Sequence, residues 1–333
     1  MSTPLGWGVV GTGDVSRYIA TDLALLSSAR LVAVSSRSPQ SARDFATELG
    51  FVRGCSLDEL LVDAAVDIVY LGTPHSTHAA HAVAALEAGK HVLVEKPLGV
   101  NAAEVERVAQ AARTAGRFAM EGMWMKFHPY YRALLDGLRA GSIGDVTAVR
   151  ASFGLPFGER DSQRWSAELA SSTLLDQGIY PVTLAHELFG EPDSVVASAD
   201  TRGDGVDLRV EATLHYAGGR YAHVAASMVG YLEPTAAISG TRGWIDLPAP
   251  FWATDRFTRH AGEIGEALMK PVLVPFDREG FGYVPMLRAV GEAVLSGLLE
   301  HPIHPFSSTV AVARTLDRIR AAAAAAQQTE IAP

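Results

Sequence analysis

The segment His91-Val92-Leu93-Val94-Glu95-Lys96-Pro97-Leu98 decides how the chain is organised. Its first four residues predict a short buried strand, because they are largely apolar and follow the helix-ending pair Gly89-Lys90. The strand must end before Pro97, since proline cannot donate to a sheet ladder. A lysine at the carboxyl end of a parallel strand points into the crevice where open α/β sheets bind ligands. Lys96 is therefore a candidate site residue, and a surface lysine after a strand is the alternative.

The composition bounds the class of protein. A length of 333 residues predicts two domains, and the 48% apolar and 20% charged content is that of a globular protein. A formal charge of −9 argues against a nucleic-acid or anionic-membrane partner. The single cysteine, Cys55, excludes an internal disulfide and a cysteine-built zinc site. The sequence contains no signal-peptide pattern and no apolar run of about 20 residues, so we expect a cytoplasmic protein.

A glycine-rich turn near the N-terminus predicts a dinucleotide site. A strand from Leu5 to Val10 precedes it, and a helix follows from Arg17 to Leu26. Gly11 permits the tight turn, and Gly13 lets the backbone approach a pyrophosphate at the helix N-terminus. Ser16 replaces the third glycine of the G-x-G-x-x-G pattern and is small enough for close packing. The expected cofactor-binding residues of this turn are Gly11, Thr12, Gly13, Asp14 and Val15.

The residues after the second strand discriminate between cofactors. This strand is expected from Arg30 to Ser35. An NAD-binding fold places Asp or Glu about twenty residues after the glycines, where it binds the ribose 2′-hydroxyl. Here Ser36 and Arg37 occupy that position, and a hydroxyl with a guanidinium would bind a 2′-phosphate. The sequence therefore favours NADP over NAD, and a plain polar loop entering the next helix is the alternative.

Alternating strands and helices continue to about residue 121. The expected helices run from Pro39 to Leu49, from Ser56 for a short stretch, from about Thr77 to Ala88, and from Asn101 to Gly116; the expected strands are Val66 to Leu71, the strand before Lys96, and Arg117 to Met120. This alternation predicts an α/β Rossmann domain with a doubly wound parallel sheet over residues 1–121. His78 and His81 share a helical face, but no carboxylate or cysteine completes a set, so we predict no metal site.

The pattern changes after Glu121. A helix is expected from Met123 to about Ala140, and two more near residues 281–300 and 307–328. Segments with strand character lie between them, at 146–153, 195–199, 206–216, 220–228, 235–239 and 243–247. We therefore predict an α+β domain on a largely antiparallel sheet over residues 122–333, and leave open whether the final helix packs back on the first domain.

A second cluster of reactive side chains lies at the start of a predicted helix that runs to Phe189. Asp176 and Tyr180 are four residues apart and so share a helical face. Pro181 is tolerated only near the first turn, which puts the helix start at Asp176 or just before. Such a pair could act on a hydroxyl proton, and a nearby lysine would favour the phenolate. A half-buried core tyrosine is the alternative.

Several motifs resemble those of the Gfo/Idh/MocA family of NAD(P)-dependent oxidoreductases over nearly the whole chain. They are Gly11-Thr12-Gly13, Thr73-Pro74 with His78, Ala88-Gly89-Lys90-His91-Val92 and Glu95-Lys96-Pro97. Two further motifs look most like the dihydrodiol dehydrogenase branch, which also holds sugar dehydrogenases and generally prefers NADP: Met120-Glu121-Gly122-Met123-Trp124 and Leu175-Asp176-Gln177-Gly178-Ile179-Tyr180-Pro181.

The resemblance implies roles for particular residues. Lys96 and Tyr180 would be the catalytic pair, with Asp176 assisting, and the peptide bond before Pro97 would be cis. The cofactor site would add Thr73, Pro74, His78, Glu95, Lys96 and Trp124. We also expect Arg164 and Trp165, in a loop with Arg160 and Asp161, to contact substrate or cofactor, an ordinary packed tryptophan being the alternative.

The implied activity is hydride transfer between NADP(H) and a secondary alcohol or carbonyl of a sugar or vicinal diol. Two alternatives remain: a relative that uses tightly bound NAD(P) for elimination or glycoside hydrolysis, and a non-catalytic dinucleotide sensor. One departure from the family pattern is Ser171-Ser172-Thr173, which replaces a glycine run and would narrow the cleft.

The second sheet also suggests self-association. Helices can cover only one of its faces, and we expect Val224, Ala226 and Met228 on the other. An open apolar sheet face is usually buried, so we predict a homo-oligomer, most simply a two-fold dimer, joined through this face.

Overall fold

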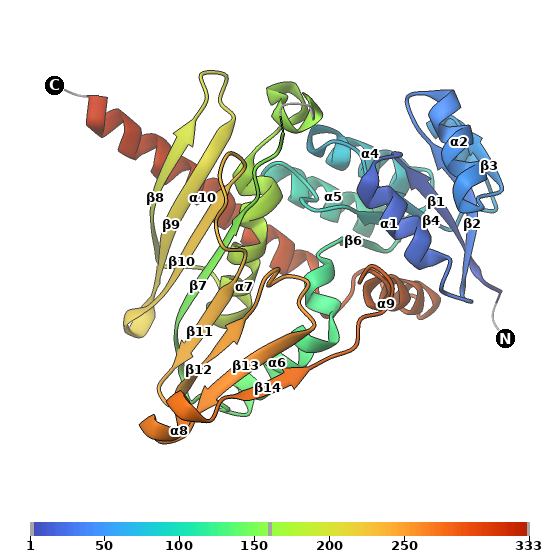
Figure 1. Ribbon diagram of the computed structural model, residues 1–333. Helices are drawn as coiled ribbons and strands as arrows, with labels where there is room; N and C mark the ends of the chain where they lie inside the picture. Colours follow the sequence, from blue (N-terminus) through green and yellow to red (C-terminus); the bar gives the residue numbers. More distant parts are fainter. Residues whose placement is uncertain (1–2, 159–161, 332–333) are drawn as a thin grey trace. The chain divides into compact units, whose positions relative to one another are not determined.

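A computed structural model describes residues 3–158 and 162–331, and the chain forms two compact units. The first unit comprises Met1–His128 and Arg278–Thr309, and the second comprises Pro129–Asp277 and Val310–Pro333 (Figure 1). The expected domain boundary after Glu121 stays a prediction, because compact packing does not by itself define a segment that folds alone.

The first unit contains a parallel sheet. Its described strands lie in the order β3-β2-β1-β4-β5-β6 and all pair in parallel. They are β1 Leu5–Val10, β2 Ala29–Ser35, β3 Arg53–Cys55, β4 Ile68–Leu71, β5 His91–Val94 and β6 Ala119–Glu121. The order reverses between β1 and β4, which is the topological switch point at which doubly wound sheets bind ligands. The predicted fold class of this half is confirmed.

Helices of the first unit begin and end largely where capping chemistry predicts. They are α1 Asp14–Leu23, α2 Pro39–Leu49, α3 Leu57–Val62, α4 His75–Glu87, α5 Ala102–Ala115 and α9 Val284–Leu295, with the 3₁₀ turn η1 Trp124–Phe127. Ser56 and Glu59 form the expected capping box, and Gly50 ends α2 with a left-handed φ of 78°. Helix α1 ends at Leu23, three residues before the predicted end at Leu26.

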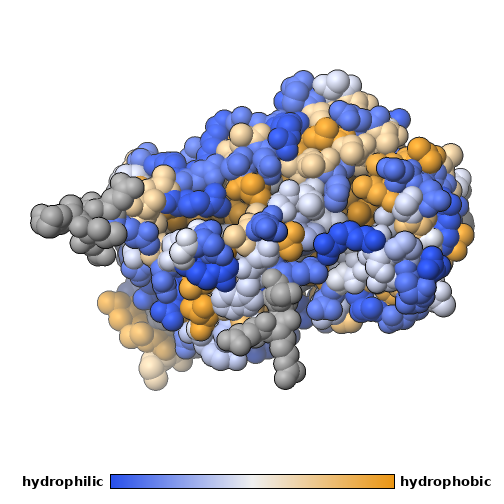
Figure 2. Space-filling model, turned by 90° about the horizontal axis from the view of Figure 1, so that it is seen from above, coloured by the Kyte–Doolittle hydropathy of each residue, from blue (hydrophilic) through white to orange (hydrophobic). Residues whose placement is uncertain are grey.

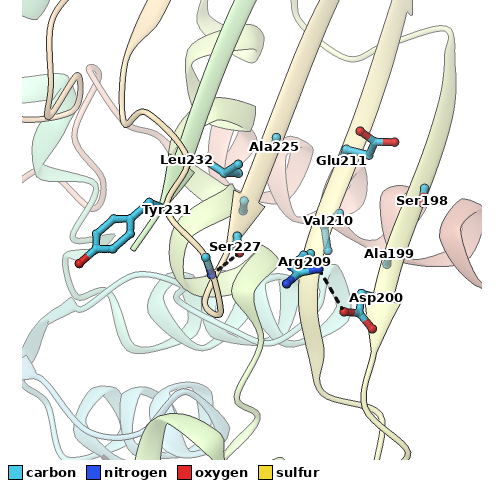
Figure 3. A pocket seen from close by; sticks show the side chains of 12 residues that line it. Ser198, Ala199, Asp200, Arg209, Val210, Glu211, Ala225, Ser227, Tyr231 and Leu232 are labelled. Atoms are coloured by element: carbon cyan, nitrogen blue, oxygen red, sulfur yellow. Dashed lines mark hydrogen bonds and ion pairs between the residues drawn. The ribbon is translucent and has the colours of Figure 1, made fainter. Parts of the chain in front are cut away.

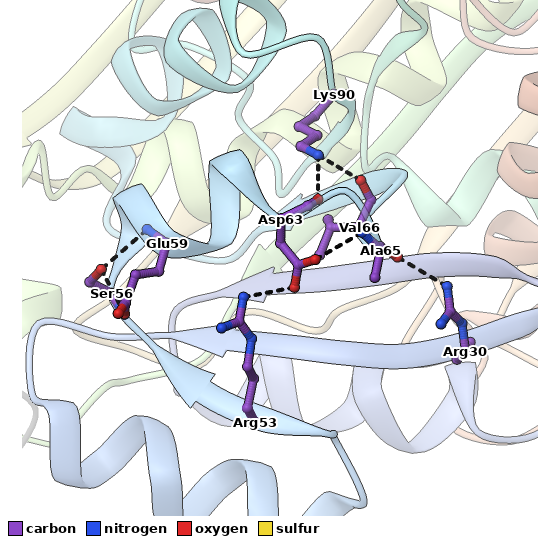
Figure 4. Close-up of polar contacts among 8 residues, drawn as sticks. All are labelled: Arg30, Arg53, Ser56, Glu59, Asp63, Ala65, Val66 and Lys90. Atoms are coloured by element: carbon purple, nitrogen blue, oxygen red, sulfur yellow. Dashed lines mark hydrogen bonds and ion pairs between the residues drawn. The ribbon is translucent and has the colours of Figure 1, made fainter.

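Lys90, from the motif Ala88-Gly89-Lys90-His91-Val92, has a structural role. Its ammonium donates to the carbonyl oxygens of Asp63 and Val66, at 2.6 and 2.9 Å (Figure 4). The Asp63 carboxylate in turn accepts from Arg53 at 2.8 Å and from the Ala65 N–H at 2.8 Å. Lys90 is almost fully buried, and burial lowers its pKa although Asp63 and Asp67 oppose the shift. The lysine thus satisfies two main-chain carbonyls in the loop that leads into β4.

The second unit is built on a mixed, mainly antiparallel sheet. Its described strands lie in the order β14-β13-β12-β11-β7-β10-β9-β8, with β7 and β10 parallel. They are β7 Val146–Gly154, β8 Ser194–Thr201, β9 Asp207–Tyr216, β10 Arg220–Ser227, β11 Ala236–Gly240, β12 Gly243–Leu247, β13 Arg256–Ala261 and β14 Val272–Pro275. The predicted α+β class is confirmed, but the last two strands escaped prediction. Strand β14 is largely exposed and β13 is mostly half-buried, and neither shows a clear alternation of apolar and polar residues.

Helices of the second unit are α6 Pro129–Arg139, α7 Ile179–Phe189, α8 Ile264–Met269 and α10 from Val310 on; α10 itself spans Phe306–Ile331. Short turns lie at η2 Ser162–Trp165, η3 Ala167–Leu169, η4 Leu174–Gly178 and η5 Ala217–Gly219. The single helix predicted from Met123 to Ala140 was wrong. It is divided into η1 and α6 at His128, which is extended because it precedes Pro129.

Helices α7 and α10 define the covered face of this sheet. Helix α7 packs on β7 and β10, while Gln327 of α10 donates to the Ala199 carbonyl of β8 at 2.7 Å. Val224, Ala226 and Met228 were predicted on the open face, and this was wrong. They are only 6%, 2% and 2% exposed.

The open face carries polar and charged side chains among small apolar ones. It carries the alternate residues of the same strands, among them Arg150, Ser152, Glu211, Thr213, His223 and Ala225, which line a groove of about 980 Å³. In the view of Figure 2, apolar residues lie among polar ones, as is normal for a protein surface. Among the described residues, no helix combines the length and apolarity that crossing a bilayer requires.

His128, at the end of η1, provides a test of the packing in the first unit. The ring lies against Trp124, with centroids 5.0 Å apart, and is almost fully buried. Burial, helped by the charge of Arg278, lowers the pKa of His128 from 6.5 to about 4. In the unfolded chain His128 is therefore protonated near pH 6.5, whereas in the folded chain it is protonated only near pH 4. The contribution of His128 to the unfolding free energy is fully present above pH 6.5 and is lost as the pH falls towards 4.

We expect this one group to remove roughly 3 kcal/mol of unfolding free energy between pH 7 and pH 4. Urea unfolding at both pH values should show a smaller loss in His128→Gln, because glutamine does not titrate. The exposed His215 provides the control variant His215→Gln, which should keep the wild-type pH dependence. Equal pH dependence in wild type and His128→Gln would contradict the assignment.

Candidate functional site

The glycine turn after β1 has the geometry of a pyrophosphate cradle. Gly11 has a φ of +104°, and a Cβ there would lie 2.3 Å from the Gly72 carbonyl oxygen. Only glycine fits, because the ends of β1 and β4 approach so closely. A Cβ at Gly13, the N-cap of α1, would meet nothing within 4 Å. Open space at a helix N-terminus beside bare backbone suits a phosphate, so these residues fit a dinucleotide.

Ser36 lies beside this turn. Its hydroxyl is 3.4 Å from that of Thr12, and the Gly11 N–H donates to the Ser35 carbonyl at 2.9 Å. The neighbouring Arg37 is exposed at the entry to α2. The chain thus brings Thr12 and Ser36 together at the carboxyl end of the sheet.

The turn that carries Lys96 is held by buried side chains. The Tyr70 hydroxyl donates to the Glu95 carboxylate at 2.9 Å, His78 Nδ1 lies 2.7 Å from the Pro97 carbonyl, and the Leu98 N–H donates to Glu121 at 2.9 Å. The Lys96–Pro97 peptide bond is cis, as the resemblance implied. Lys96 itself is 8% exposed.

His78 links this turn to the end of β4. Its Nε2 lies 2.6 Å from the Thr73 carbonyl, while Nδ1 faces Pro97, so both ring nitrogens meet acceptors. Complete burial lowers the pKa of His78, and the two carbonyl groups oppose this shift because they favour the protonated ring. Pro74 is the N-cap of α4, so Thr73 and Pro74 directly precede the helix and His78 lies in its first turn.

Trp124 lies in the core of the first unit. Its ring stacks on Tyr283 with centroids 4.3 Å apart and an interplanar angle of 22°. The side chain is 7% exposed, so most of its surface is already covered by the protein. Its expected contact with the cofactor stays a prediction.

Asp176 and Tyr180 lie at the start of a helical segment that begins just before Asp176, as predicted. Residues Leu174–Gly178 form one π-helical turn that continues directly into α7. Pro181, in the first turn of α7, has no N–H to donate and its ring crowds the carbonyl four residues back, which favours the wider turn. Single π turns of this kind are frequent at functional sites.

The Tyr180 ring belongs to an aromatic cluster. Its centroid lies 5.8 Å from that of Phe153 and 5.5 Å from that of Trp252, and those two rings stack at 3.6 Å. These two rings limit the orientation of the tyrosine ring, and Tyr180 is only 4% exposed.

Asp207 is a residue of this site that the sequence did not reveal. Its carboxylate accepts from the Leu174 N–H at 2.7 Å and also bonds Ser172, thereby holding the start of the π turn. Burial raises the pKa of Asp207, and these hydrogen bonds oppose the shift. Its partner Leu174 lies 33 residues away in the chain, so no local pattern could indicate the contact.

Arg164 links the preceding loop to Asp176. Its guanidinium lies 3.7 Å from the Asp176 carboxylate and 4.2 Å from the centre of the Phe157 ring. Ser171 donates from its hydroxyl to the Arg164 carbonyl, and Trp165 donates from its indole N–H to Gly158 at 3.3 Å. Arg160 and Asp161 lie outside the described residues.

The segment Ser171-Ser172-Thr173, which departs from the family pattern, bonds through its hydroxyls to neighbouring residues of the same unit. Besides Ser171, the Ser172 hydroxyl accepts from the Leu175 N–H at 3.1 Å, and Thr173 donates to the Gln177 side chain at 3.2 Å. These bonds tie the Arg164 loop to the π turn.

A pocket of about 540 Å³ lies elsewhere in the second unit, beside the ends of β8, β9 and β10 (Figure 3). Arg209 points towards Asp200 across it, 3.8 Å apart, and Tyr231 lies at its rim. Its twelve described lining residues include none of the predicted site residues. In the described ranges, no group of three or more His, Cys, Asp or Glu side chains is arranged to hold a metal ion.

Comparison with known proteins identifies the family. Residues 5–123 match the oxidoreductase family with an NAD-binding Rossmann fold, and residues 131–246 match the GFO/IDH/MocA C-terminal domain. The chain is 35% identical to trans-1,2-dihydrobenzene-1,2-diol dehydrogenase from Bos taurus over 327 residues, covering 96% of each protein. The chain belongs to the GFO/IDH/MocA family. The human enzyme of the same name is also 35% identical over 96% of both chains.

Solved GFO/IDH/MocA-like structures agree. KijD10, a 3-ketoreductase from Actinomadura kijaniata solved with NADP and TDP-benzene, is 27% identical with a TM-score of 0.85, covering 96% of this chain and 98% of its own. The aldose-aldose oxidoreductase of Caulobacter crescentus, solved with glycerol, is 25% identical with a TM-score of 0.86, covering 97% and 98%.

This GFO/IDH/MocA chain is an NAD(P)-dependent oxidoreductase. The predicted family and the predicted likeness to the dihydrodiol dehydrogenases are both confirmed. The individual site residues stay predictions. Lys96 lies in the first unit and Asp176 and Tyr180 in the second, so their joint action is a proposal.

Proposed function

We propose that this chain is an NADP(H)-dependent dehydrogenase or reductase acting on a secondary alcohol or carbonyl of a sugar or vicinal diol. The observation that carries the proposal is the pairing of the glycine cradle with Ser36, in a relative of diol dehydrogenases. The names of the relatives support a sugar or diol as the substrate, since they include a dihydrodiol dehydrogenase, a 3-ketoreductase and an aldose oxidoreductase.

The cofactor would be held by the first unit. Gly11 and Gly13 would admit the pyrophosphate to the N-terminus of α1, and Thr12, Asp14 and Val15 complete that turn. Ser36 and Arg37 would bind a 2′-phosphate through a hydroxyl and a guanidinium, whereas a carboxylate there would repel it. Thr73, Pro74, His78 and Glu95 would shape the neighbouring part of the crevice.

The chemistry rests on Lys96, Asp176 and Tyr180. NADP, when bound, supplies or accepts the hydride. The Tyr180 hydroxyl would give or take the proton of the substrate oxygen. The Lys96 ammonium would stabilise negative charge that develops on that oxygen and would orient it. Asp176, paired with Arg164 at 3.7 Å, would position the substrate beside the tyrosine.

Cofactor preference gives one test. NADP should bind more tightly than NAD, and Ser36→Asp should reverse this order, because a carboxylate repels the 2′-phosphate and accepts from a ribose hydroxyl. Fluorescence titration with both cofactors measures the change. Ser38→Asp is the matched control, since Ser38 caps α2 and aspartate caps equally well. Equal affinities for both cofactors in the wild type would contradict the proposal.

The catalytic pair gives a second test. Tyr180→Phe removes one oxygen, so folding and NADP affinity should stay nearly unchanged while turnover falls by about 10²–10⁴-fold. Lys96→Met should lower turnover at least as far, because the charge beside the substrate oxygen is lost. Since the two residues act together, the double variant should be little worse than the poorer single variant.

These variants are assayed with a panel of aldoses and vicinal diols. The change in free NADP in solution measures turnover, and the melting temperature of each variant measures its stability. Additive losses with weakened cofactor binding would indicate purely structural roles. Near-normal turnover in Tyr180→Phe would remove the tyrosine from the mechanism. Product formation without net change in free NADP would instead favour elimination or hydrolysis on tightly bound cofactor.

We further propose that two copies associate through the open face of the eight-stranded sheet. That face presents both Arg150 and Glu211, so a two-fold related copy would offer complementary charges. Light scattering at micromolar concentration should give the mass of a dimer, and Ala225→Arg in the groove should give a monomer. Val62→Arg, at a site 80% exposed in the first unit, should stay dimeric. A monomeric wild type would contradict this proposal.

A further inference from the structure

A chain of buried polar side chains ends on the main chain beside Lys96. The Leu98 N–H donates to Glu121 Oε1 at 2.9 Å, and Glu121 Oε2 lies 2.9 Å from His304 Nε2. On the other side of the ring, His304 Nδ1 lies 3.3 Å from Lys126 Nζ. Glu121, Lys126 and His304 are only 3%, 1% and 2% exposed. We call these three side chains the Glu121–His304–Lys126 chain.

The direction of each hydrogen bond in this chain follows from chemistry. An ammonium can only donate, so Nδ1 of His304 must accept from Lys126. The ring proton is then on Nε2, which donates to Glu121. The Thr309 hydroxyl, 3.2 Å from Nε2, provides a second contact at the same atom. The other oxygen of Glu121 accepts from the Leu98 N–H. The Lys126 ammonium therefore determines which atom donates in each hydrogen bond between Lys126 and His304 and between His304 and Glu121.

The four segments that meet here are far apart in sequence. Glu121 ends β6, Lys126 lies in η1, His304 closes a short turn with His301, and Thr309 lies in the first turn of α10. Burying three ionisable side chains is costly unless each is fully paired. A packed apolar core would stabilise the same unit at lower cost, so stability alone does not account for the arrangement.

We propose that Glu121, His304 and Lys126 are positioning residues that fix the location of Lys96. The inference rests on the proposed function, because it assigns Lys96 to the reaction. Glu121 holds Leu98 while His78 holds the Pro97 carbonyl, so the main chain after Lys96 is held from two sides. Releasing one of them lets the turn shift, and a displacement of about 1 Å in a reacting group can cost about 10²-fold in rate.

Glu121→Gln tests the proposal with little change in shape. A glutamine carbonyl can still accept from Leu98, but its amide then puts a donor against the Nε2 proton of His304. Asp22→Asn is the matched control, since Asp22 is a buried carboxylate of the same unit that accepts from the Phe281 and Tyr283 N–H groups, both at 2.8 Å. Both variants should lower the melting temperature. Only Glu121→Gln should disturb Lys96.

The readout for Lys96 is independent of turnover. The chain has four lysines, so protein carrying [¹³Cε]-lysine should give four resolvable signals, with Lys96 assigned by its loss in Lys96→Met. In Glu121→Gln the Lys96 signal should move, because a shift of the turn changes the surroundings of its side chain. Turnover should fall by about 10–10²-fold with NADP affinity within about twofold of wild type. Asp22→Asn should leave the Lys96 signal and turnover unchanged.

His304 gives a second pair of variants, which keeps the test open if Glu121→Gln does not fold. In His304→Gln the amide can still donate to Glu121, whereas His304→Leu removes every polar contact. The glutamine variant should therefore keep the Lys96 signal at its wild-type position and most of the turnover, whereas the leucine variant should shift the signal and lose turnover.

Two outcomes separate the positioning role from the proposed reaction. An unchanged Lys96 signal and unchanged turnover in Glu121→Gln, with Lys96→Met inactive, would overturn the positioning role and leave the reaction standing. A shifted Lys96 signal with normal turnover in Lys96→Met would overturn the catalytic role of Lys96 and support the positioning. Equal losses in His304→Gln and His304→Leu would also overturn the inference.

Discussion

The close approach of the main chain at Gly11 and Gly72 is the constraint on which the first unit depends. Strands β1 and β4 are neighbours at the point where the strand order reverses, and any Cβ at Gly11 would lie 2.3 Å from the Gly72 carbonyl oxygen. The bare backbone and the exposed N-terminus of α1 together have the geometry that suits a phosphate group. The position of Ser36 beside Thr12, and of the Lys96 turn after β5, follows from the parallel order of these strands.

The buried polar groups divide into two kinds. Lys90 satisfies two main-chain carbonyls in the loop before β4 and so has a structural role. Tyr70, His78 and Glu121 instead meet the residues that flank Lys96. In the second unit Asp207 holds the start of the π turn that contains Asp176 and leads into α7, where Tyr180 lies. The proposed function thus relies on polar groups that hold the main chain around Lys96, Asp176 and Tyr180 as well as on those three side chains.

Errors in the sequence-based prediction of the second unit have physical causes. The sheet face occupied by Val224 and Ala226 was assigned incorrectly, because alternation defines two faces but does not say which one the helices cover. The helix predicted across Pro129 was divided, although proline's restriction of the preceding residue could have indicated this. The π turn before α7 is favoured by Pro181, and hydrophobic periodicity does not reveal such a change in helix width.

The sequence by itself determined the family, the parallel sheet, the glycine turn, the helix caps at Ser56 and Gly50, and the residues proposed for hydride and proton transfer. These are local patterns, since each depends on residues within one turn or one strand and its connection. Only the tertiary structure decided that Glu121, Lys126 and His304 meet, and that Asp207 holds the start of the π turn before α7. Such contacts join segments separated by up to 183 residues, and the burial that makes them consequential exists only once both segments are packed.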